Sequence, residues 1–577
     1  MLDDFMVVEY LFADLVLLDG DVITVDSGER IAEAVAVKDG KIIGVGSSEE
    51  IKRLIGATTK VIALAGRAVL PGLTDAHVHM IQGGTRDLDP DKLDCRDFYY
   101  PEIRSIADVV AKIRAHSNRI PQGEWIEVIG SPMQDYRFKE RRFPTRRDLD
   151  EAAPEHPAFM SFGAHITVVN SLGLRRARIT GETPDPVAGI IVKDDAGEPT
   201  GMLREKAQNL VTNLTSPGGE HVIRDAIERG VTIPSIHSYG FEDLKRGIRS
   251  AVQRCLERGV TTVHDIVTSP EELRAYQEVL LEGDLKMRIL LLVRAYESKI
   301  RADSLLNVGL GTGFGNDWLK IGGIKLSIDG GMTGCNAAFY EPYCHEPWNY
   351  GVVRIPQETL DILVERFHRA GDRLCVHAIG DKAFDMILDA YEKTLKKYPR
   401  MDHRHRIEHG PSNYLCTPER LRRMKELGIF PVPNINFLYY FGDPLMVTLG
   451  EERMMDAFPF KMMMNAGIRF TSGTDAPGYM PIDVLRDIWS CVARKTWSGD
   501  TISPEQAVTV MDAIKIFTID AAYCGFEEAI KGSIEVGKLA DLVVLRENPL
   551  KIDAERIKDI EVDYTIVNGE IMYQKGS

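Results

Sequence analysis

The sequence lacks several features that mark particular classes of protein. No apolar run approaches the roughly 18 residues that a membrane-spanning helix requires. The first ten residues, MLDDFMVVEY, have neither the basic stretch nor the small-residue cleavage site of a signal peptide. No low-complexity segment or short repeat is visible. We therefore expect a cytoplasmic protein that does not bind membranes.

Paired cysteines and an excess of positive charge are also absent. The eight cysteines are scattered, with no Cys-x-x-Cys pair, which argues against a disulfide framework and for a reducing compartment. Lysine and arginine total 70 against 86 acidic residues, a formal net charge of −16. This charge disfavours nucleic acid and anionic membranes as partners. We expect a small-molecule substrate, and a homo-oligomer (a dimer or larger) as the assembly.

Both ends of the chain resemble short strands joined by tight turns. Asp39-Gly40 and Asn568-Gly569 each lie between alternating apolar residues, and Asp19-Gly20 has a similar setting. Such dipeptides are strong short-range signals for β-hairpins. The sequence therefore predicts β-structure at both termini.

The sequence pattern is different between these ends, where strand-like apolar runs alternate with helical stretches such as QETLDILVERFHRA. Eight such runs occupy residues 68–80, 259–267, 287–295, 321–330, 373–380, 405–410, 428–436 and 468–477. Eight strands alternating with helices predict an α/β fold, a (β/α)8 TIM-type barrel.

The spacing of these runs also predicts the domain organisation. The gap from about residue 80 to 258 is too long for one crossover, so we expect an insert subdomain at about 85–240, after the first strand, that forms a cap beside the barrel mouth. The barrel as a whole would span residues 70–530. Residues 1–69 and 531–577 would pair with each other as one discontinuous β-sandwich domain.

Polar side chains recur where the barrel strands end or inside them. In a strand, residues i and i+2 point to the same side, so two histidines spaced in this way can both face the barrel mouth, where barrel enzymes keep their active sites. Each residue alone is explained more simply by packing, but their joint register with strand ends predicts a metal site. The candidate ligands are His77, His79, Lys325, His377, His409 and Asp475.

These residues and their flanking motifs resemble the amidohydrolase superfamily. The set includes PGLTDAHVHM around the first two histidines, and GSIEVGKLADLVVL near the C-terminus. Four further segments, FPTRRDLDEAAPEHPAFM, GAHITVVNSLGL, GEPTGMLREKA and WLKIGGIKLSIDGG, resemble the YtcJ-like branch, amidohydrolase family 3, which includes N-substituted formamide deformylases. The resemblance covers residues 14–573.

The resemblance implies a site with one or two divalent ions. His77 and His79 would hold the more buried ion, and His377 and His409 the other. Lys325, whose neutral form is favoured in an apolar strand, would be carboxylated and bridge the ions. Zinc suits such a mixture of imidazole and carboxylate ligands. Asp475 would contact the first ion and serve as general base, then general acid.

The expected activity is that of a metal-dependent hydrolase acting on a non-peptide C–N bond in an amide, N-formyl or cyclic amide substrate. Ester or lactone hydrolysis, and a decarboxylation, hydration or C–C cleavage on the same metal site, remain alternatives. A non-catalytic scaffold is disfavoured, because a scaffold has no need for metal ligands and all of them are present.

Two segments depart from the branch, SPMQDYRF and GMTGCNAAFYEPYCHEPWNYG, and both are expected on the substrate side. His165, Trp348 and Tyr439 are candidate substrate contacts. For His264 and Asp265, at the end of the second strand, the sequence leaves open whether they orient a ligand or only pack in the core.

Overall fold

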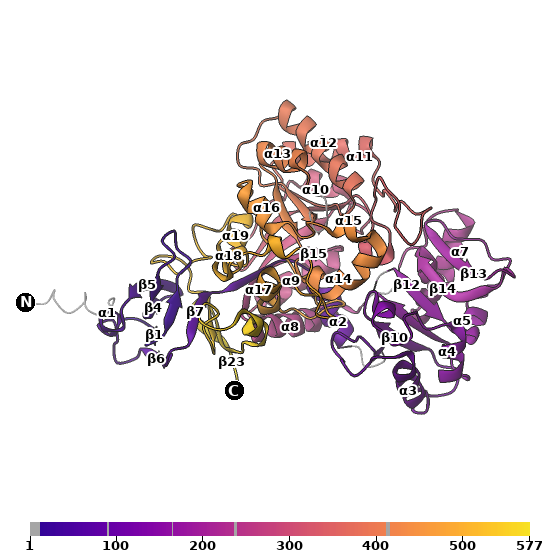
Figure 1. Cartoon of the computed structure of the whole chain (residues 1–577), viewed down its shortest axis with the longest axis horizontal. Helices are drawn as coiled ribbons and strands as arrows, with labels where there is room; N and C mark the ends of the chain where they lie inside the picture. Colours follow the sequence, from indigo (N-terminus) through magenta and orange to yellow (C-terminus); the bar gives the residue numbers. More distant parts are fainter. Residues whose placement is uncertain (1–11, 89–91, 164, 236–238, 411–415, 577) are drawn as a thin grey trace, which may run out of the picture.

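The computed structural model describes residues 12–88, 92–163, 165–235, 239–410 and 416–576. Figure 1 shows three regions along the longest axis. The N-terminal strands lie at one end, a barrel surrounded by helices lies in the middle, and the sheet formed between residues 92 and 205 lies at the other end. The division into barrel, insert and terminal β-sandwich domain, with the boundaries given above, stays a prediction.

The central sheet is a barrel of parallel strands in the order β8-β15-β16-β17-β18-β19-β20. Strands next to each other in the sheet follow each other in the barrel sequence, which is the connectivity of a (β/α)8 barrel. Most of their residues are buried, because helices cover the outside of the sheet. Their bounds are β8 Leu73–Val78, β15 Val260–Val267, β16 Arg288–Arg294, β17 Leu319–Ser327, β18 Leu374–His377, β19 Arg406–His409 and β20 Phe430–Pro433.

The eighth run closes the barrel without forming a regular strand. The backbone N–H of Gly473 donates to the carbonyl of Pro433 on β20, at 3.4 Å. On the other side, the N–H of Asp475 donates to the carbonyl of His77 on β8, at 2.8 Å. The predicted barrel fold is therefore confirmed, with seven ladder strands and an extended eighth segment between the two sheet edges.

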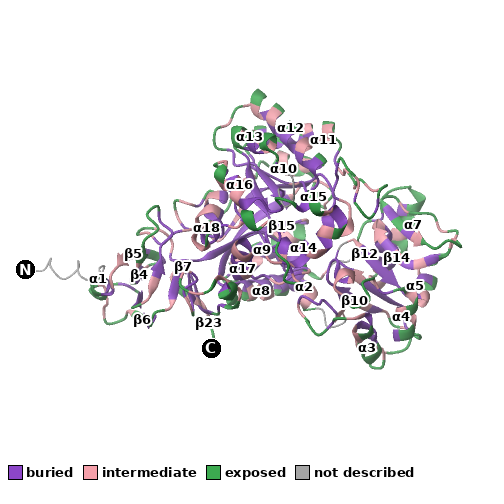
Figure 2. Cartoon of the chain, in the orientation of Figure 1, coloured by how far each residue is buried: buried purple, intermediate pink, exposed green. Residues whose placement is uncertain are grey.

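Helices follow the strands and surround the sheet, and buried residues concentrate in the middle of the molecule (Figure 2). No helix in the described part of the chain is both long and apolar enough to span a bilayer. The helices of the barrel region are α2 Met80–Asp87, α8 Phe241–Glu257, α9 Pro270–Leu281, α10 Ala302–Val308, α11 Gln357–Arg369, α12 Asp381–Lys397, α13 Pro418–Leu427, α14 Asn436–Leu449, α15 Glu451–Met454, α16 Phe460–Asn465, α17 Val484–Ala493, α18 Val510–Ile516 and α19 Ile519–Cys524.

The two termini build two sheets that share one hydrophobic cluster. One sheet has the order β5-β4-β1-β6, and the other, β23-β22-β21-β7-β2-β3, joins both ends of the chain through the antiparallel pair β7 and β21. The bounds are β1 Leu15–Leu18, β2 Asp21–Ile23, β3 Ile31–Ala32, β4 Ala34–Lys38, β5 Lys41–Gly46, α1 Ser48–Lys52, β6 Lys60–Ala63, β7 Ala68–Pro71, β21 Leu542–Leu545, β22 Val562–Val567 and β23 Glu570–Gln574.

Two of the three predicted hairpins are confirmed. Asp39-Gly40 joins β4 to β5 and Asn568-Gly569 joins β22 to β23, and all four residues have positive φ, as a type I′ turn requires. The prediction is wrong at Asp19-Gly20, where β1 and β2 belong to different sheets. A Cβ on Gly20 would lie 2.5 Å from the Leu64 side chain, so this glycine allows a close approach as the chain passes between the sheets.

A third sheet, β13-β14-β12-β11-β10-β9, lies between the first and second barrel strands in the sequence. It contacts loops at the carboxyl ends of the barrel strands. Tyr99 donates its hydroxyl to the carbonyl of Pro477, just beyond the eighth segment, and Arg204 pairs with Glu346 in the loop after β17. The elements are β9 Lys92–Asp94, α3 Ile106–Ser117, β10 Ile126–Gly130, α4 Arg146–Ala152, β11 Ala158–Phe162, β12 Ile166–Val169, α5 Ser171–Arg176, β13 Gly189–Lys193, β14 Pro199–Glu205, α6 Asn209–Thr212 and α7 Gly219–Glu228.

Candidate metal centre

Six polar side chains meet inside the barrel at the carboxyl ends of its strands, and we call them the six-residue cluster. One comes from β8, one from the residue after it, one each from β17, β18 and β19, and one from the eighth segment. Its members are His77, His79, Lys325, His377, His409 and Asp475. These are the six candidate ligands of the sequence analysis, and the structure brings all of them together.

The donor atoms of the cluster are close enough to share ions. Nε2 of His77 and Nε2 of His79 lie 3.4 and 3.1 Å from the same carboxylate oxygen of Asp475. Nζ of Lys325 lies 3.5 Å from Nε2 of His77. The His409 ring centroid is 4.4 Å from that of His77 and 4.4 Å from that of His377. The cluster is therefore continuous from β8 to β18.

A buried ion pair fixes the orientation of His77. Nδ1 of His77 donates to Glu408 at 2.5 Å, so the lone pair of the neutral ring is on Nε2, facing Asp475 and Lys325. Glu408 also accepts two bonds from Arg406, at 2.6 and 2.8 Å, and all three side chains are fully buried. Arg406 in turn donates to Nδ1 of His264 at 2.7 Å.

The sequence analysis missed Glu408 and Arg406. The signal was present, since RIEH places two opposite charges two residues apart in a short strand. Inside a barrel such a pair must be satisfied internally. Of the two residues whose role the sequence left open, His264 accepts a hydrogen bond from Arg406, and Asp265 accepts a 2.7 Å bond from the N–H of Met80, directly after His79.

The other two buried histidines are oriented in the same manner. Nδ1 of His409 donates to the side-chain oxygen of Asn434 at 2.7 Å, which puts the ring lone pair on Nε2. Nε2 of His377 donates to the carbonyl of Gly330 at 3.3 Å, which puts its lone pair on Nδ1. Both assignments are those that a metal ligand needs, because only an unprotonated ring nitrogen can bind an ion.

Burial favours the neutral form, which can bind cations, of three histidines and the lysine of the cluster: His77, His377, His409 and Lys325. Burial lowers the pKa of His77 and of His377 well below the usual range, and that of His409 to about 4. Burial also lowers the pKa of Lys325 to about 8, so a neutral amine is accessible near neutral pH. For Asp475, burial acts to raise the pKa, but the hydrogen bond with His79 holds it below its usual value.

The members of the six-residue cluster differ in their exposure to solvent. His77 is fully buried, whereas the His79 and Asp475 side chains are each 25% exposed. Asp475 has a positive φ of 58°, and its segment is held by Thr474, whose N–H and hydroxyl donate to Asp75 at 2.9 and 2.5 Å. His79 and Asp475 therefore form the solvent-facing border of the cluster.

The three candidate substrate contacts occupy different surroundings. His165, before β12, lies against the glycines of the loop after β17. Trp348 is 76% exposed. Tyr439 packs against Trp489 and Trp497, with ring centroids 5.6 and 5.3 Å away.

The ring that stacks on His409 is Phe437, at a centroid distance of 6.3 Å. This residue was not singled out from the sequence, because the run NFLYYF does not by itself show which of its rings faces the cluster. In a helix Phe437 and Phe441 share a face, and their rings are 5.1 Å apart, whereas Tyr439 points elsewhere.

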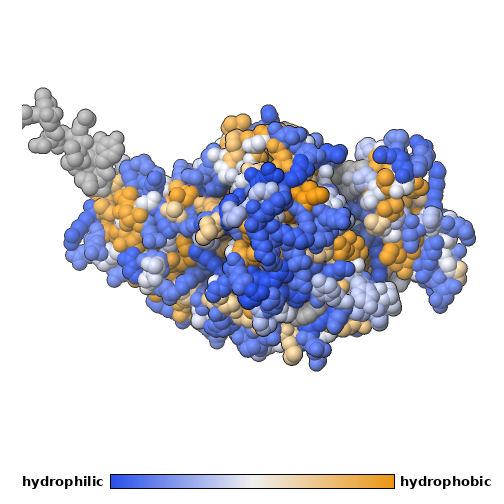
Figure 3. All heavy atoms as spheres, turned by 90° about the horizontal axis from the view of Figure 1, so that it is seen from above, coloured by the Kyte–Doolittle hydropathy of each residue, from blue (hydrophilic) through white to orange (hydrophobic). Residues whose placement is uncertain are grey.

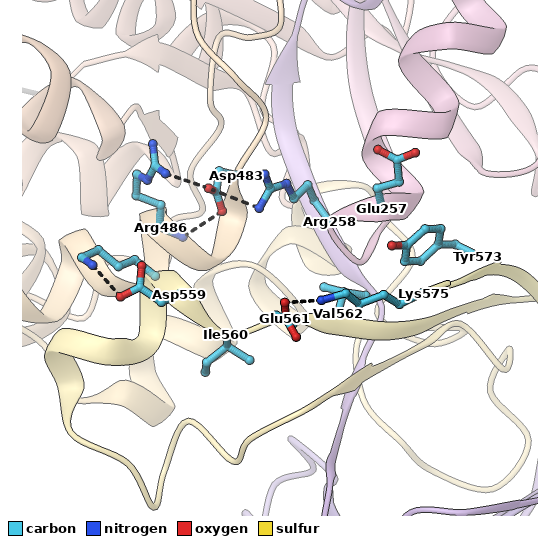
Figure 4. A pocket seen from close by; sticks show the side chains of 11 residues that line it. Glu257, Arg258, Asp483, Arg486, Asp559, Ile560, Glu561, Val562, Tyr573 and Lys575 are labelled. Atoms are coloured by element: carbon cyan, nitrogen blue, oxygen red, sulfur yellow. Dashed lines mark hydrogen bonds and ion pairs between the residues drawn. The ribbon is translucent and has the colours of Figure 1, made fainter. Parts of the chain in front are cut away.

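One face of the surface and one cavity lie away from the six-residue cluster. The face in Figure 3 is mostly hydrophilic, with hydrophobic side chains in separate areas. A cavity of about 440 Å³ lies between the C-terminal end of α8, the start of α17 and the C-terminal strands (Figure 4). Its charges pair with one another, as Asp483 does with Arg258 and Arg486, and it contains no member of the six-residue cluster.

Comparisons with known proteins agree with this geometry. The profile of the amidohydrolase family matches residues 60–573. The putative amidohydrolase YtcJ of Bacillus subtilis is 30% identical over 95% of this chain and 97% of its own. The N-substituted formamide deformylase of Arthrobacter pascens is 27% identical over 97% of this chain and 98% of its own.

A solved structure agrees as well. An uncharacterized metal-dependent hydrolase from Pyrococcus furiosus superposes with a TM-score of 0.67 and 25% identity, covering 93% of this chain and 100% of that one. The family profile and these near full-length matches cover the terminal, inserted and barrel regions together. The chain therefore belongs to the amidohydrolase family, and it is a metal-dependent amidohydrolase, a hydrolase that acts on C–N bonds other than peptide bonds.

Proposed function

We propose that this enzyme cleaves the C–N bond of a small amide, N-formyl or cyclic amide substrate, using one or two zinc ions held by the six-residue cluster. One observation carries the proposal: ligand atoms of His77, His409 and Asp475 lie within 4.8 Å of one another, with the other three side chains beside them. A small N-formyl substrate is also in keeping with the similarity to the N-substituted formamide deformylase.

The donor set fits zinc. Two ligands on one tetrahedral zinc ion with bonds of about 2.0–2.1 Å are about 3.3 Å apart. Asp475 lies 3.4 Å from His77 and 3.1 Å from His79, and Lys325 lies 3.5 Å from His77. One polar atom of the cluster, Nδ1 of His79, is buried with no hydrogen-bond partner among the described residues.

Lys325 has the surroundings that carboxylation requires. It is 3% exposed, and its lowered pKa favours the neutral amine. A neutral amine adds carbon dioxide and releases a proton, which gives a carbamate with two oxygens and one negative charge. That group would complete a bridge between two cations next to His77, at a point where an ammonium group would repel them.

Zinc, when bound, would lower the pKa of a water molecule toward about 7 and polarise the substrate carbonyl. The protein's own proton carrier would be Asp475, which is 25% exposed and so can reach both water and substrate. Its carboxylate takes a proton from the attacking water and gives it to the leaving nitrogen. His77, by contrast, is fully buried and fixed by Glu408, so it holds its position and does not exchange protons with the substrate.

The test combines metal analysis with a substrate screen. We expect one to two zinc ions per chain, and loss of activity after chelation with recovery on adding zinc. The screen contains N-formyl amines, N-acyl amino acids, cyclic ureides and aryl amides, with esters and lactones as the comparison set. Asp475→Asn should abolish turnover, whereas the exposed Asp500→Asn should not. Full activity in metal-free protein, or turnover of esters alone, would contradict the proposal.

Three further expectations belong to this proposal. Trp348 would contact the substrate, and its alanine variant should raise KM, whereas Tyr439 packs against Trp489 and Trp497 instead. A reducing cytoplasmic location fits the eight free cysteines. A homo-oligomer is the expected assembly, to be checked by sedimentation of the purified chain.

A further inference from the structure

Arg294, the last residue of β16, faces the interior of the barrel. Leu292 on the same strand packs with Ile266 of β15 and Cys375 of β18, in a small cluster that is separate from the main core under the helices. Residues two apart in a strand point to the same side, so Arg294 lies on the same side as Leu292, one step nearer the barrel mouth. His377 follows Cys375 by the same step. The guanidinium is therefore on the face of the sheet that carries the metal ligands.

The Arg294 side chain also lies at the level of the six-residue cluster. In the pairing of β16 with β17, Arg294 is opposite Lys325. Its Nη2 donates to Oγ of Ser327 at 3.2 Å, and Ser327 is opposite His377 in the pairing of β17 with β18. Two members of the cluster thus lie on the two strands that follow β16 around the barrel. The guanidinium therefore borders the cluster at the barrel mouth.

The guanidinium of Arg294 lacks a counter-charge. Among the described residues it forms no ion pair, its one side-chain hydrogen bond is that to Ser327, and its Nε is buried without a partner. Burial, followed by the charge of Arg354, lowers the pKa of Arg294, although Glu297 acts in the opposite sense. A charge removed from water is costly unless an opposite charge reaches it. The site is therefore arranged to receive an anion.

A second arginine lies on the same side of the cluster. The backbone N–H of Arg354 donates to the carbonyl of Ile328, one residue beyond the end of β17. Nε of Arg354 lies 3.6 Å from a carboxylate oxygen of Glu297, which is longer than a hydrogen bond. Because Glu297 follows β16 and Arg354 follows β17, this contact spans the ends of the two strands beside Arg294. The pairing is too weak to use all of the positive charge there.

Lys206 brings a third positive charge, from the inserted sheet. It directly follows β14, and the carboxylate of its neighbour Glu205 is already bonded to His165 and Asn336. In the ranges that the structure describes, Nζ of Lys206 has no ion pair or hydrogen bond. Burial, followed by the charge of Arg354, lowers the pKa of this lysine. Positive charge therefore exceeds negative charge on this side of the cluster.

We propose that Arg294, together with Lys206 and Arg354, binds a carboxylate group of the substrate beside the metal centre. A guanidinium offers a planar fork of N–H donors that matches the two oxygens of a carboxylate, and it stays charged at any working pH. The substrate is then an amide with a carboxylate a few bonds from the scissile C–N bond, such as an N-acyl amino acid. This inference rests on the proposed function and deepens it, because the name of the N-substituted formamide deformylase specifies no such charge.

The kinetic test compares N-formylphenylalanine with N-formylphenethylamine, which differ by one carboxylate. If the substrate screen selects another acyl group, the same pair is made with that group. Wild-type kcat/KM should favour the acid by about 10–100-fold, the scale of a charge-assisted hydrogen bond. Arg294→Gln should bring this ratio close to one, mainly through KM, and Lys206→Gln should lower it less. Arg301→Gln, at an exposed arginine just before α10, should keep the wild-type ratio.

Calorimetry on the zinc-loaded protein tests binding without turnover, using the two amine products, phenylalanine and phenethylamine. Phenylalanine should bind wild type at least about tenfold more tightly than Arg294→Gln, whereas phenethylamine should bind both equally. If Arg294→Gln leaves phenylalanine binding unchanged, the carboxylate binds elsewhere, zinc included, and the proposal is overturned. A loss of zinc from Arg294→Gln overturns it as well, because the guanidinium would then serve the metal centre and not the substrate.

The outcomes separate this inference from the proposed function. Wild-type protein that cleaves both members of the pair equally well, or prefers the one without the carboxylate, overturns the inference and leaves C–N hydrolysis intact. This comparison needs only wild type, so it decides the matter even if Arg294→Gln does not fold. Zinc-loaded protein that cleaves no amide overturns the proposed function, whereas the product-binding comparison still judges the three cations by themselves.

Discussion

The buried Glu408 should control both stability and metal affinity, and Glu408→Gln separates its charge from its shape. Glu408 is fully buried between Arg406 and His77. Burial acts to raise the pKa of Glu408, but the charge of Arg406 and the bond to His77 hold it well below its usual range. The carboxylate is therefore ionised whenever the protein is folded near neutral pH.

The expected loss of stability follows from the unpaired charge of Arg406 that the substitution leaves in the barrel. Glutamine keeps the volume but removes the counter-charge, so Arg406 stays in the barrel interior with no ionised partner in contact. Breaking a buried ion pair in this way costs about 3–5 kcal/mol. Against a typical unfolding free energy of about 5–15 kcal/mol, this is a large fraction. Because the amide also orients His77 less firmly, zinc affinity should fall by roughly 10–100-fold.

Urea unfolding measures the first effect and competition with a chromophoric chelator the second. Glu365→Gln is the matched control, because Glu365 pairs with Lys397 on the exposed surface at 3.0 Å and should leave both quantities unchanged. If Glu408→Gln loses stability but binds zinc within threefold of wild type, the carboxylate only balances Arg406. The argument that it fixes the His77 tautomer would then be refuted.

Three other changes have defined outcomes. Lys325→Ala should lose one zinc ion and most turnover by elemental analysis and rate assay, with partial rescue by short carboxylic acids, while the exposed Lys286→Ala should not. Gly331 has an ordinary φ of −80°, so the methyl added in Gly331→Ala should displace the His165 ring without straining the backbone. Turnover should fall while the melting temperature stays unchanged, and adding His165→Ala should lower turnover no further. Burial lowers the pKa of His403 from 6.5 to about 4, so below pH 6.5 the unfolded chain binds a proton that the folded chain refuses. The unfolding free energy should therefore fall between pH 6.5 and 4, by about 3 kcal/mol from this group, and His403→Asn should reduce that slope in urea titrations at several pH values.

The sequence predicted residue positions best where the position depends on local secondary structure alone. His77 lies next to last in β8, and His377 and His409 end β18 and β19, so the strand pattern alone brings them to one end of the barrel. The hairpins at Asp39-Gly40 and Asn568-Gly569 followed from turn chemistry in the same way. In both cases the two-residue alternation of a strand and the place where the strand ends decide where the residue lies. Both signals are contained in residues that are neighbours in the sequence.

Long-range partners were harder to predict. Glu408 and Arg406 resemble any polar pair on a strand until the barrel closes and brings His77, 331 residues away, to the same carboxylate. Tyr439 and Phe437 differ by two residues, and only the phase of α14 decides which ring lies against His409. Asp19-Gly20 has hairpin composition, but its flanking strands find better partners in different sheets. Each of these outcomes depends on tertiary contacts that no local pattern contains.

The proposed general base lies on the barrel segment that has the weakest support from the sheet. The eighth segment has no ladder of its own, so side chains replace one. Thr474 donates to Asp75 before Asp475, and after it the Tyr99 hydroxyl lies within hydrogen-bond distance of the carbonyls of Pro477 and Met480, at 2.9 and 2.7 Å, so that its one proton can serve either. A loop fixed at both ends by hydrogen bonds can keep a left-handed residue such as Asp475 in place, where a regular strand would force its side chain into the alternating pattern. Tyr99 thus helps to hold the segment that carries the Asp475 carboxylate.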